Sequence, residues 1–235
     1  EQNTVAGTTN KLLAKISSRV LQAFSGALPR GLTVGNPVRS DILNLREKPE
    51  SYRKGRPLKL LVVGGSLGAQ AINELMPKVL ASWTGDVRID VWHQTGKRNI
   101  EAVSSWYLDA DVEARVDAYI DNMNDAYYWA DVVLCRSGAM TISELAIAGL
   151  PSILVPFPYA IDDHQTKNAE SLVSAGAARI MPQTELSVAS LQSVLNEFIS
   201  EVDLLKNMGK SAKKVAYPDA TENVVAECKR FIKHD

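Results

Sequence analysis

Three short segments carry the residue types that hold phosphates and sugars. They are 64–69, which reads GGSLGA, 136–144, which reads RSGAMTISE, and 156–165, which reads PFPYAIDDHQ. Glycines let an anion approach the backbone, and the N-terminus of a following helix offers free N–H groups and a partial positive charge. Each segment is therefore a candidate loop for a phosphorylated ligand.

The glycine-rich segment is close to the GxGxxG pattern without matching it, and it has no lysine of the kind that completes a P-loop. The adjacent Gly64 and Gly65 allow close approach of a phosphate, and Ser66 adds a hydroxyl donor. A plain turn from strand to helix is the competing interpretation. The segment by itself leaves both open.

The other two segments also have two interpretations each. Thr141, followed three residues later by Glu144, has the spacing of a capping box. An acidic residue this far into the helix can instead accept hydrogen bonds from ribose hydroxyls. Asp163 is a plausible N-cap, which places His164 and Gln165 in the first turn of a helix, pointing at the crevice. Gln165 can then read sugar hydroxyls or simply face water.

Metal and redox chemistry is not predicted. The three histidines show no zinc-ligand spacing, and Cys135 and Cys228 lie far apart, so we expect two reduced thiols in the core. Asp109 and Asp111 match the sequence pattern of a metal-binding DxD motif but not its expected position in the fold. They precede a predicted strand, and that is the wrong edge of a sheet for a ligand.

The elements that must position these segments alternate between short apolar runs and helical periods. Continuous apolar runs predict buried strands at 58–63, 88–93, 113–119, 131–135, 152–155 and 177–181. Helices are predicted at 9–18, 69–83, 99–108, 122–130, 141–148, 164–175, 187–200, 202–214 and 220–233. This alternation is typical of α/β proteins with a Rossmann-like, doubly wound parallel sheet. Ligands bind such sheets beyond the carboxyl ends of the strands, where the three segments fall.

Composition excludes several other classes of protein. The 235 residues are 46% hydrophobic and 23% charged, as in a folded domain rather than a disordered chain. Lys and Arg number 26 against 27 Asp and Glu, so no overall basic field attracts a nucleic acid. No apolar run is long enough to span a membrane, and the first residues lack the features of a signal peptide. Because the chain does not begin with Met, we expect a fragment or a processed chain.

Together, these segments resemble the MurG family, the bacterial glycosyltransferases that add N-acetylglucosamine to lipid I during peptidoglycan synthesis. The matching motifs run in family order over nearly the whole chain: EQN at 1–3, GNPVR at 35–39, GGSLGA at 64–69, HQTG at 93–96, YIDNM at 119–123, CRSGAMT at 135–141 and DDHQ at 162–165. The resemblance implies a GT-B fold, in which two Rossmann-like domains face a cleft.

The resemblance also implies how the chain is divided. Residues 1–37 would be the tail of the N-terminal acceptor domain with its linker, and 38–216 the donor-binding domain. Residues 217–235 would form a helix that returns to the N-terminal domain. That helix carries an apolar stripe that needs a partner: Val224, Val225, Cys228, Phe231 and Ile232.

By the same resemblance, the donor would be UDP-N-acetylglucosamine. Arg39 and Ser66 would contact its diphosphate, Ala139 and Met140 would offer backbone N–H groups to phosphate, and the backbone of Ile120 would pair with the uracil edge. The resemblance implies the following donor-site residues: Asn3, Arg39, Gly65, Ser66, Ile120, Met123, Ala139, Met140, Thr141, Ile142, Ser143, Glu144, His164 and Gln165.

Four of these residues would read the two sugars. Glu144 would hold the ribose hydroxyls, and Gln165, with His164, would read the hydroxyls of N-acetylglucosamine. Asn3 would line the sugar end of the cleft. Gly65 and Met123 are further candidates for contact with the donor.

The implied reaction is an inverting transfer to the 4-hydroxyl of N-acetylmuramic acid in lipid I. Helix N-termini and Arg39 would stabilise the leaving UDP, so neither a metal nor a cofactor is expected. The expected partners are the donor, lipid I and the chain's own N-terminal domain, with no nucleic acid. The expected location is peripheral, on the cytoplasmic face of the bacterial inner membrane, with this fragment itself soluble.

This chain departs from the family in a large respect, because the acceptor site and the apolar membrane-facing patch are absent. The family's glycine-rich N-terminal motif, with its histidine, is absent, so the general base is expected there. His93 is the one alternative base in this chain, and we discount it because its motif sits among structural turns. Two other functions stay open: a donor-binding subunit without catalysis, and another UDP-sugar enzyme such as an epimerase, which would need carboxylates and a histidine in the cleft.

Overall fold

The computed structural model describes residues 1–46, 55–65, 67–201 and 203–231. Within them, a parallel sheet has the strand order β5-β4-β3-β6-β7-β8. Its strands are β3 (Leu58–Val63), β4 (Ile89–Gln94), β5 (Arg115–Asp117), β6 (Val132–Cys135), β7 (Ser152–Leu154) and β8 (Ala178–Ile180). The predicted strands and the doubly wound architecture are therefore confirmed.

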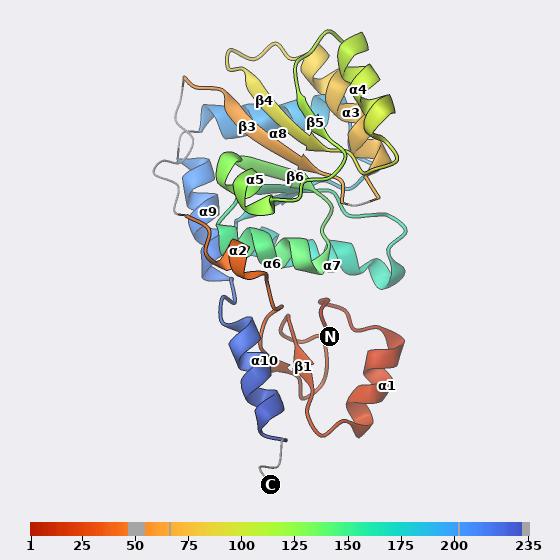
Figure 1. Cartoon of the computed structure of the whole chain (residues 1–235), viewed down its shortest axis with the longest axis vertical. Coiled ribbons are helices and arrows are strands. Elements are labelled where there is room, and N and C mark those ends of the chain that lie inside the picture. Colours follow the sequence, from red (N-terminus) through yellow and green to blue (C-terminus); the bar gives the residue numbers. More distant parts are fainter. Residues whose placement is uncertain (47–54, 66, 202, 232–235) are drawn as a thin grey trace.

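Helices cover both faces of the sheet (Figure 1). One face packs against α3 (Gln70–Ala81), α4 (Ile100–Asp109) and α8 (Val188–Ser200). The other packs against α2 (Ser40–Leu43), α5 (Met123–Trp129), α6 (Ala139–Ala148) and α7 (His164–Ser174), and α9 (Leu204–Lys214) contributes to both cores. Strand β3 shows why both faces are covered by helices. Its apolar side chains alternate, so Leu60 and Val62 pack in one core and Leu61 packs in the other.

The structure differs from the predicted elements mainly at short ones. Strand β5, at the sheet edge, spans three residues where seven were expected, because an edge strand has a partner on one side only. The four-residue helix α2 and the short 3₁₀ helix η1 (Ile161–Asp163) were not predicted. Neither is long enough to show a helical period in the sequence.

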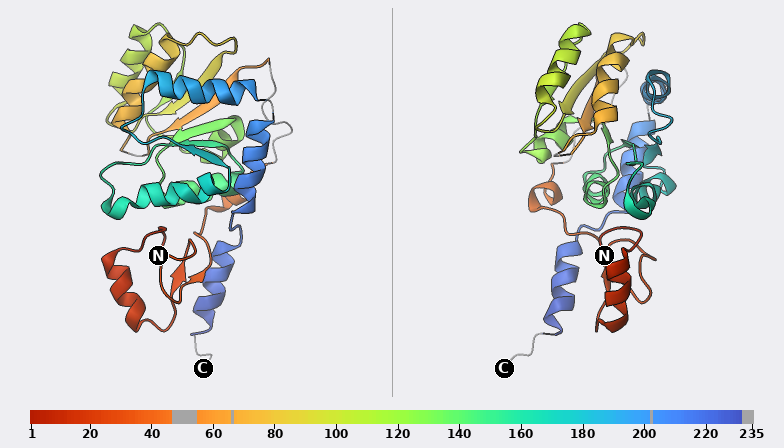
Figure 2. Two further views of the ribbon diagram at one scale, coloured as in Figure 1. Left: turned by 180° about the vertical axis from the view of Figure 1, so that it is seen from behind. Right: turned by 90° about the vertical axis from the view of Figure 1, so that its right-hand side faces the viewer.

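A smaller lobe lies beneath the sheet domain and contains both ends of the described chain (Figures 1 and 2). It comprises α1 (Thr8–Ile16), the short parallel pair β1 (Leu21–Gln22) and β2 (Leu32–Thr33), and α10 (Ala220–Lys229). Helix α10 lies beside the N-terminal segment, and Arg19 Nε donates to Glu227 Oε2 at 2.8 Å across this contact. The segments 1–37 and 217–231 thus meet, while the domain boundaries given above stay a prediction.

Most of the apolar stripe of α10 stays uncovered by the described residues, and its expected packing on the N-terminal domain stays a prediction. Val225 is 43% exposed and Phe231 58% exposed, whereas Ala220 and Glu227 are buried. Ile232 lies outside the described residues. Helix α10 is therefore held in this lobe by a small residue and an ion pair.

The two cysteines also differ in their surroundings. Cys135 is buried in β6, and burial raises its pKa to about 12. Cys228 is exposed on α10, so the expectation of two core thiols is wrong for this residue. Of the helices in the described part of the chain, none has the length and apolar character needed to cross a membrane.

Candidate functional site

The strand order changes direction between β3 and β6. From β3 the chain proceeds outward through β4 to β5, and from β6 it proceeds the other way through β7 to β8. Loops that leave the carboxyl ends at such a point diverge and open a crevice, where ligands of doubly wound proteins bind. Segments 64–69 and 136–138 flank this point, and 155–163 follows the next strand. The three predicted loops thus share one sheet edge.

The glycines of the first loop have different roles. A Cβ on Gly64 would lie 2.7 Å from the backbone N of Ala69, and one on Gly68, where φ is +80°, would collide with the Thr95 carbonyl. These two are needed for the turn itself. Gly65 also has a positive φ, +78°, but it is exposed and faces open space. It is the glycine at which a phosphate can approach, while Ser66 lies outside the described residues.

The second loop leads into α6, which begins two residues earlier than predicted. Its N-cap is Gly138, with no hydrogen bond from a capping side chain, so the first N–H groups face the crevice uncapped. Thr141 therefore lies in the first turn and Glu144 in the second. The capping-box explanation for Glu144 is wrong, because neither residue is at the position that it requires.

The remaining residues of α6 divide between core and surface. Ala139 and Ile142 are buried, and Met140 is 38% exposed. Ser143 Oγ donates to the Ala139 carbonyl and accepts from Asn36 Nδ2 at 3.2 Å. The side chains of Ala139, Ile142 and Ser143 are thus used within the protein, so a ligand would meet this stretch mainly through the backbone.

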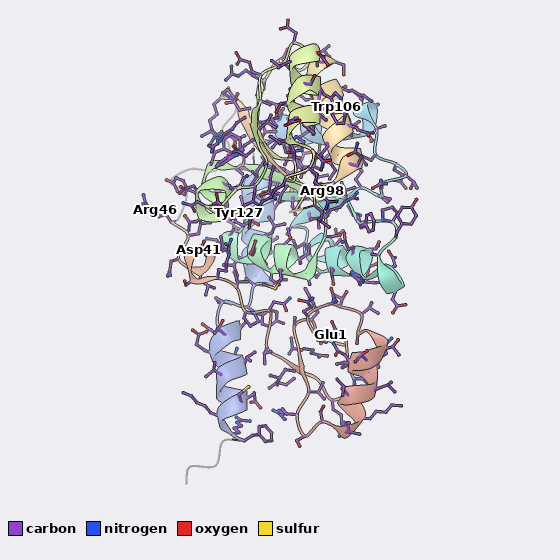
Figure 3. All side chains as sticks on the ribbon, turned by 45° about the vertical axis from the view of Figure 1, so that its right-hand side comes forward. Glu1, Asp41, Arg46, Arg98, Trp106 and Tyr127 are labelled. Carbon is purple, nitrogen blue, oxygen red and sulfur yellow. The ribbon has the colours of Figure 1, made fainter. Side chains whose placement is uncertain are left out.

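Glu144 lies partly buried between three elements. Tyr127 Oη, from α5, donates to Glu144 Oε2 at 2.8 Å. Burial raises the pKa of Glu144, and the hydrogen bond from Tyr127 and the charge of Arg39 lower it. Arg39 precedes α2, and its Nε lies 3.8 Å from Asp41 Oδ1, while Figure 3 shows Asp41 near Tyr127. Arg39 and Asp41 both act electrostatically on Glu144. The predicted residues Arg39 and Glu144 are therefore brought together.

The third loop is closed by Gln165. Its Oε1 accepts from the backbone N of Phe157 at 2.9 Å, which leaves its amide nitrogen for another partner. Asp163 is the N-cap of α7 as predicted, although its carboxylate accepts from the Thr166 hydroxyl rather than from the backbone. Asp162 and Asp163 both have left-handed backbones, with φ of +53° and +51°, which are strained conformations that cluster at ligand-binding loops. His164 follows in the first turn.

Asn3 reaches this edge through Asn168 of α7. Asn168 is fully buried, and its Nδ2 donates to Asn3 Oδ1 at 3.1 Å and to the Ser137 carbonyl at 3.3 Å. Its Oδ1 accepts from the backbone N and the hydroxyl of Thr4, both at 2.9 Å. The start of the chain is thereby tied to the second loop.

Ile120 and Met123 lie at the end of the loop after β5. The backbone N–H of Ile120 donates to Gln94 Oε1 at 2.9 Å, so an incoming base would meet the Ile120 carbonyl or compete with Gln94 for the N–H. Met123, the first residue of α5, is 9% exposed and packs in the core. Its side chain therefore stabilises the fold.

Sequence reasoning missed four residues that position others: Gln94, Tyr127, Arg136 and Asn168. Arg136 donates to the carbonyls of Val155 and Pro156, each at 3.1 Å, and to Gln183 Oε1 at 2.6 Å. It thus holds the start of the third loop. The only signal in the sequence was that Gln94 and Arg136 belong to motifs already singled out.

His93 is not available as a base. It is fully buried, its ring nitrogens lie 2.9 Å from Tyr107 Oη and 3.1 Å from Asn73 Oδ1, and burial lowers its pKa to about 3. Within the described ranges, no group of three or more His, Cys, Asp or Glu is arranged to hold a metal ion. A cavity of about 670 Å³ lies elsewhere, between the smaller lobe and α6 and α7, and includes only Ile142 and Ser143 of the predicted residues.

Comparison with known proteins agrees with this geometry. Residues 59–224 match the model of the glycosyltransferase family 28 C-terminal domain. The chain belongs to glycosyltransferase family 28. The family 28 match extends from β3 into α10 and includes all three loops.

Individual relatives cover the rest of the chain. A UDP-N-acetylglucosamine--N-acetylmuramyl-(pentapeptide) pyrophosphoryl-undecaprenol N-acetylglucosamine transferase from Shewanella pealeana is 49% identical over 98% of this chain and 64% of its own length. The enzyme of the same name from Chromohalobacter salexigens is 52% identical over 97% of this chain and 64% of its own length. This family 28 chain therefore spans less than two thirds of the length of those relatives.

Solved structures agree on the fold. The crystal structure of Acinetobacter baumannii MurG superposes with a TM-score of 0.84 at 36% identity, covering 98% of this chain and 66% of that one. A glycosyltransferase of kitacinnamycin reaches 0.64 at 18% identity, over 93% of this chain and 56% of its own. The fold of this family 28 chain is thus that of a GT-B C-terminal domain.

Proposed function

We propose that this chain is the donor-binding part of a MurG-type transferase. The donor is UDP-N-acetylglucosamine, and the acceptor is the 4-hydroxyl of N-acetylmuramic acid in lipid I. The observation that carries this proposal is the convergence of three loops, two uncapped helix starts and Glu144 at one switch point of the sheet. The names of the relatives supply the identity of the sugar donor and the acceptor.

The helix starts bind the diphosphate in this proposal. Gly65 admits a phosphate to the backbone before α3, Ala139 and Met140 donate N–H groups from the start of α6, and Arg39 adds a positive charge. Ser66 is proposed to donate its hydroxyl, although it lies outside the described residues. Anion binding at these positions stabilises the UDP that departs in the reaction.

The remaining residues select the sugars and the base. Glu144 accepts from the ribose hydroxyls, and the backbone of Ile120 pairs with uracil. The amide nitrogen of Gln165, with His164 beside it and Asn3 at the sugar end of the cleft, binds the hydroxyls of N-acetylglucosamine. This role of Gln165 is supported because, among the described residues, its side chain uses only the carbonyl oxygen in a hydrogen bond.

The proposed reaction is a single displacement with inversion. The acceptor oxygen forms a bond to C1 of N-acetylglucosamine, the bond from C1 to the diphosphate oxygen breaks, and UDP leaves with the electron pair. The hydroxyl proton passes to a base. Because His93 is buried, we propose that this base belongs to the part of the relatives that this chain does not span. A lipid acceptor brings the reaction to a membrane surface, and we propose that this surface is the cytoplasmic face of the bacterial inner membrane.

Calorimetric titration with UDP and with UDP-N-acetylglucosamine tests the donor site. We expect both to bind with and without EDTA. Glu144→Ala should weaken UDP binding by about 1–3 kcal/mol, the usual cost of losing hydrogen bonds to a charged group. An unchanged dissociation constant, with only a lower melting temperature, would contradict the assignment of Glu144.

A transfer assay tests the rest of the reaction. The chain is incubated with the donor and lipid I, alone and after mixing with the purified N-terminal domain of a relative. We expect turnover only in the mixture, because a positioned base contributes about 10²–10⁴-fold. Turnover by the chain alone would show that the base is misplaced here, and binding without turnover in the mixture would favour a non-catalytic donor-binding subunit.

A further inference from the structure

The hydroxyl of Tyr127 makes its hydrogen bond with a carboxylate that also faces the site. Tyr127 is 2% exposed, and its ring packs in the core with residues of α2, β3 and α6. Its Oη lies 2.8 Å from Glu144 Oε2. Because packing fixes the ring, the phenol is a rigid donor that holds Glu144 in one orientation.

Glu144 has spare acceptor capacity on the other side. Among the described residues, its hydrogen bonding involves only Oε2, and Arg39 lies nearer to Asp41 in an exposed ion pair. A carboxylate has about four acceptor positions. One is taken by Tyr127, so Oε1 and the second lone pair of Oε2 stay available for a diol.

We infer that Tyr127 is a positioning residue that orients the Glu144 carboxylate toward the ribose hydroxyls of the bound nucleotide and thereby sets the preference for a ribonucleotide over a 2′-deoxyribonucleotide. The inference rests on the donor site proposed above. Tyr127 itself does not touch the ligand, because the core encloses its ring and its hydroxyl is turned toward Glu144.

The electrostatics agree with this geometry. Burial raises the pKa of Glu144, and the hydrogen bond from Tyr127 is the first of the influences that lower it. The other charged or titratable groups that face it are Arg39, Asp41 and Cys135. Removing the phenol hydroxyl therefore costs the carboxylate both its orientation and part of the stabilisation of its ionised form.

The test compares UDP with 2′-deoxy-UDP by titration calorimetry. For the unmodified protein we expect UDP to bind about tenfold or more tightly, since the deoxy form loses a hydrogen bond to a charged group. In Tyr127→Phe the ratio of the two affinities should fall to about two- or threefold. Partial unfolding lowers both affinities alike, and both diphosphates titrate alike, so the ratio reports the ribose contacts alone.

Three further variants complete the test. Tyr128→Phe, on the exposed neighbour in α5, should leave the ratio unchanged. In Glu144→Gln the ratio should also fall, and the double variant Tyr127→Phe/Glu144→Gln should show no additional loss, because both changes remove one interaction. In Tyr127→Phe the pH at which UDP affinity declines on acidification should also rise.

Two outcomes separate this inference from the proposed function. If Glu144→Ala weakens UDP binding while Tyr127→Phe leaves the ratio and the pH profile unchanged, the positioning role is overturned and the donor site stands. If Glu144→Ala leaves UDP affinity unchanged, the donor site itself is wrong. Additive losses in the double variant would also overturn the positioning role.

Discussion

Gly65 and its neighbours illustrate how one residue type serves two purposes in a single loop. Gly64 and Gly68 are enclosed by backbone atoms, so the turn excludes any side chain there. Gly65 shares the left-handed backbone of Gly68 but faces open space. At the scale of single residues, a side chain at Gly65 would therefore strain the backbone without meeting any other described atom, and it would obstruct the phosphate of the proposed ligand.

Gly65→Ala is expected to cost about 1–2 kcal/mol of stability, because φ is +78°, and also to weaken UDP binding. Gly176→Ala is the matched control, since Gly176 has a φ of +72° and open space around it but lies after α7, away from the loops. Thermal unfolding and UDP titration should show similar destabilisation in both variants and a loss of affinity only in the first. Equal affinities would contradict the role of Gly65.

His93 makes stability depend on pH. Its pKa is about 3 in the folded protein against 6.5 ordinarily, so the unfolded chain binds the proton more readily and stability falls as pH decreases from 6.5 toward 3. The free energy of unfolding should fall by up to about 2 kcal/mol between pH 6.5 and pH 5 from this residue. His93→Gln should flatten this part of the denaturation profile and keep UDP binding. An unchanged slope would show that other groups cause the acid sensitivity.

At the scale of elements, the first turn of α7 and the loop after β7 form one unit. Gln165 of the helix accepts from Phe157 of the loop, and Arg136 holds the loop where it leaves the strand. The same glutamine is proposed to read the sugar with its amide nitrogen. The carbonyl oxygen of Gln165 holds the loop, and its amide nitrogen is proposed to bind the sugar. Substitutions that change one atom and keep the other can therefore separate the two roles.

Gln165→Glu keeps an acceptor for the Phe157 N–H but removes the amide donor, whereas Gln165→Ala removes both. Both variants should bind UDP normally and UDP-N-acetylglucosamine about 5–10-fold more weakly, the equivalent of one net hydrogen bond. If only the alanine variant loses affinity for UDP-N-acetylglucosamine, Gln165 holds the loop and does not contact the sugar.

At the scale of the whole molecule, two contacts join distant parts of the chain. Asn168 connects α7 to Asn3 and Thr4, more than 160 residues away in sequence, and Glu227 connects α10 to Arg19. The first contact joins the smaller lobe to the sheet domain and the second holds the smaller lobe together. Buried asparagines that serve several partners at once are costly to remove, since each partner is left unsatisfied.

Asn168→Ala should release residues 1–16 from the sheet domain. We expect faster amide hydrogen exchange over this segment and a loss of about 1–3 kcal/mol in stability, with the exchange of β3 and β6 little changed. Asn207→Ala, on the exposed face of α9, is the control and should alter neither. Unchanged exchange over residues 1–16 would show that the rest of the smaller lobe, and not Asn168, holds them.

The sequence by itself determined the local features of this protein. Apolar runs such as Leu58–Val63 and the spacing of glycines and helix starts predicted the strands, the helices and the three loops, because those signals depend on neighbouring residues. The motifs in order also indicated the family. Only the tertiary structure decided three other features. Gly65 is the glycine of the first loop that faces open space, and Glu144 accepts a hydrogen bond from Tyr127 instead of capping its helix. Asn168 holds Asn3 beside the second loop. Those outcomes depend on contacts between residues far apart in the chain, and packing of the two cores sets these contacts.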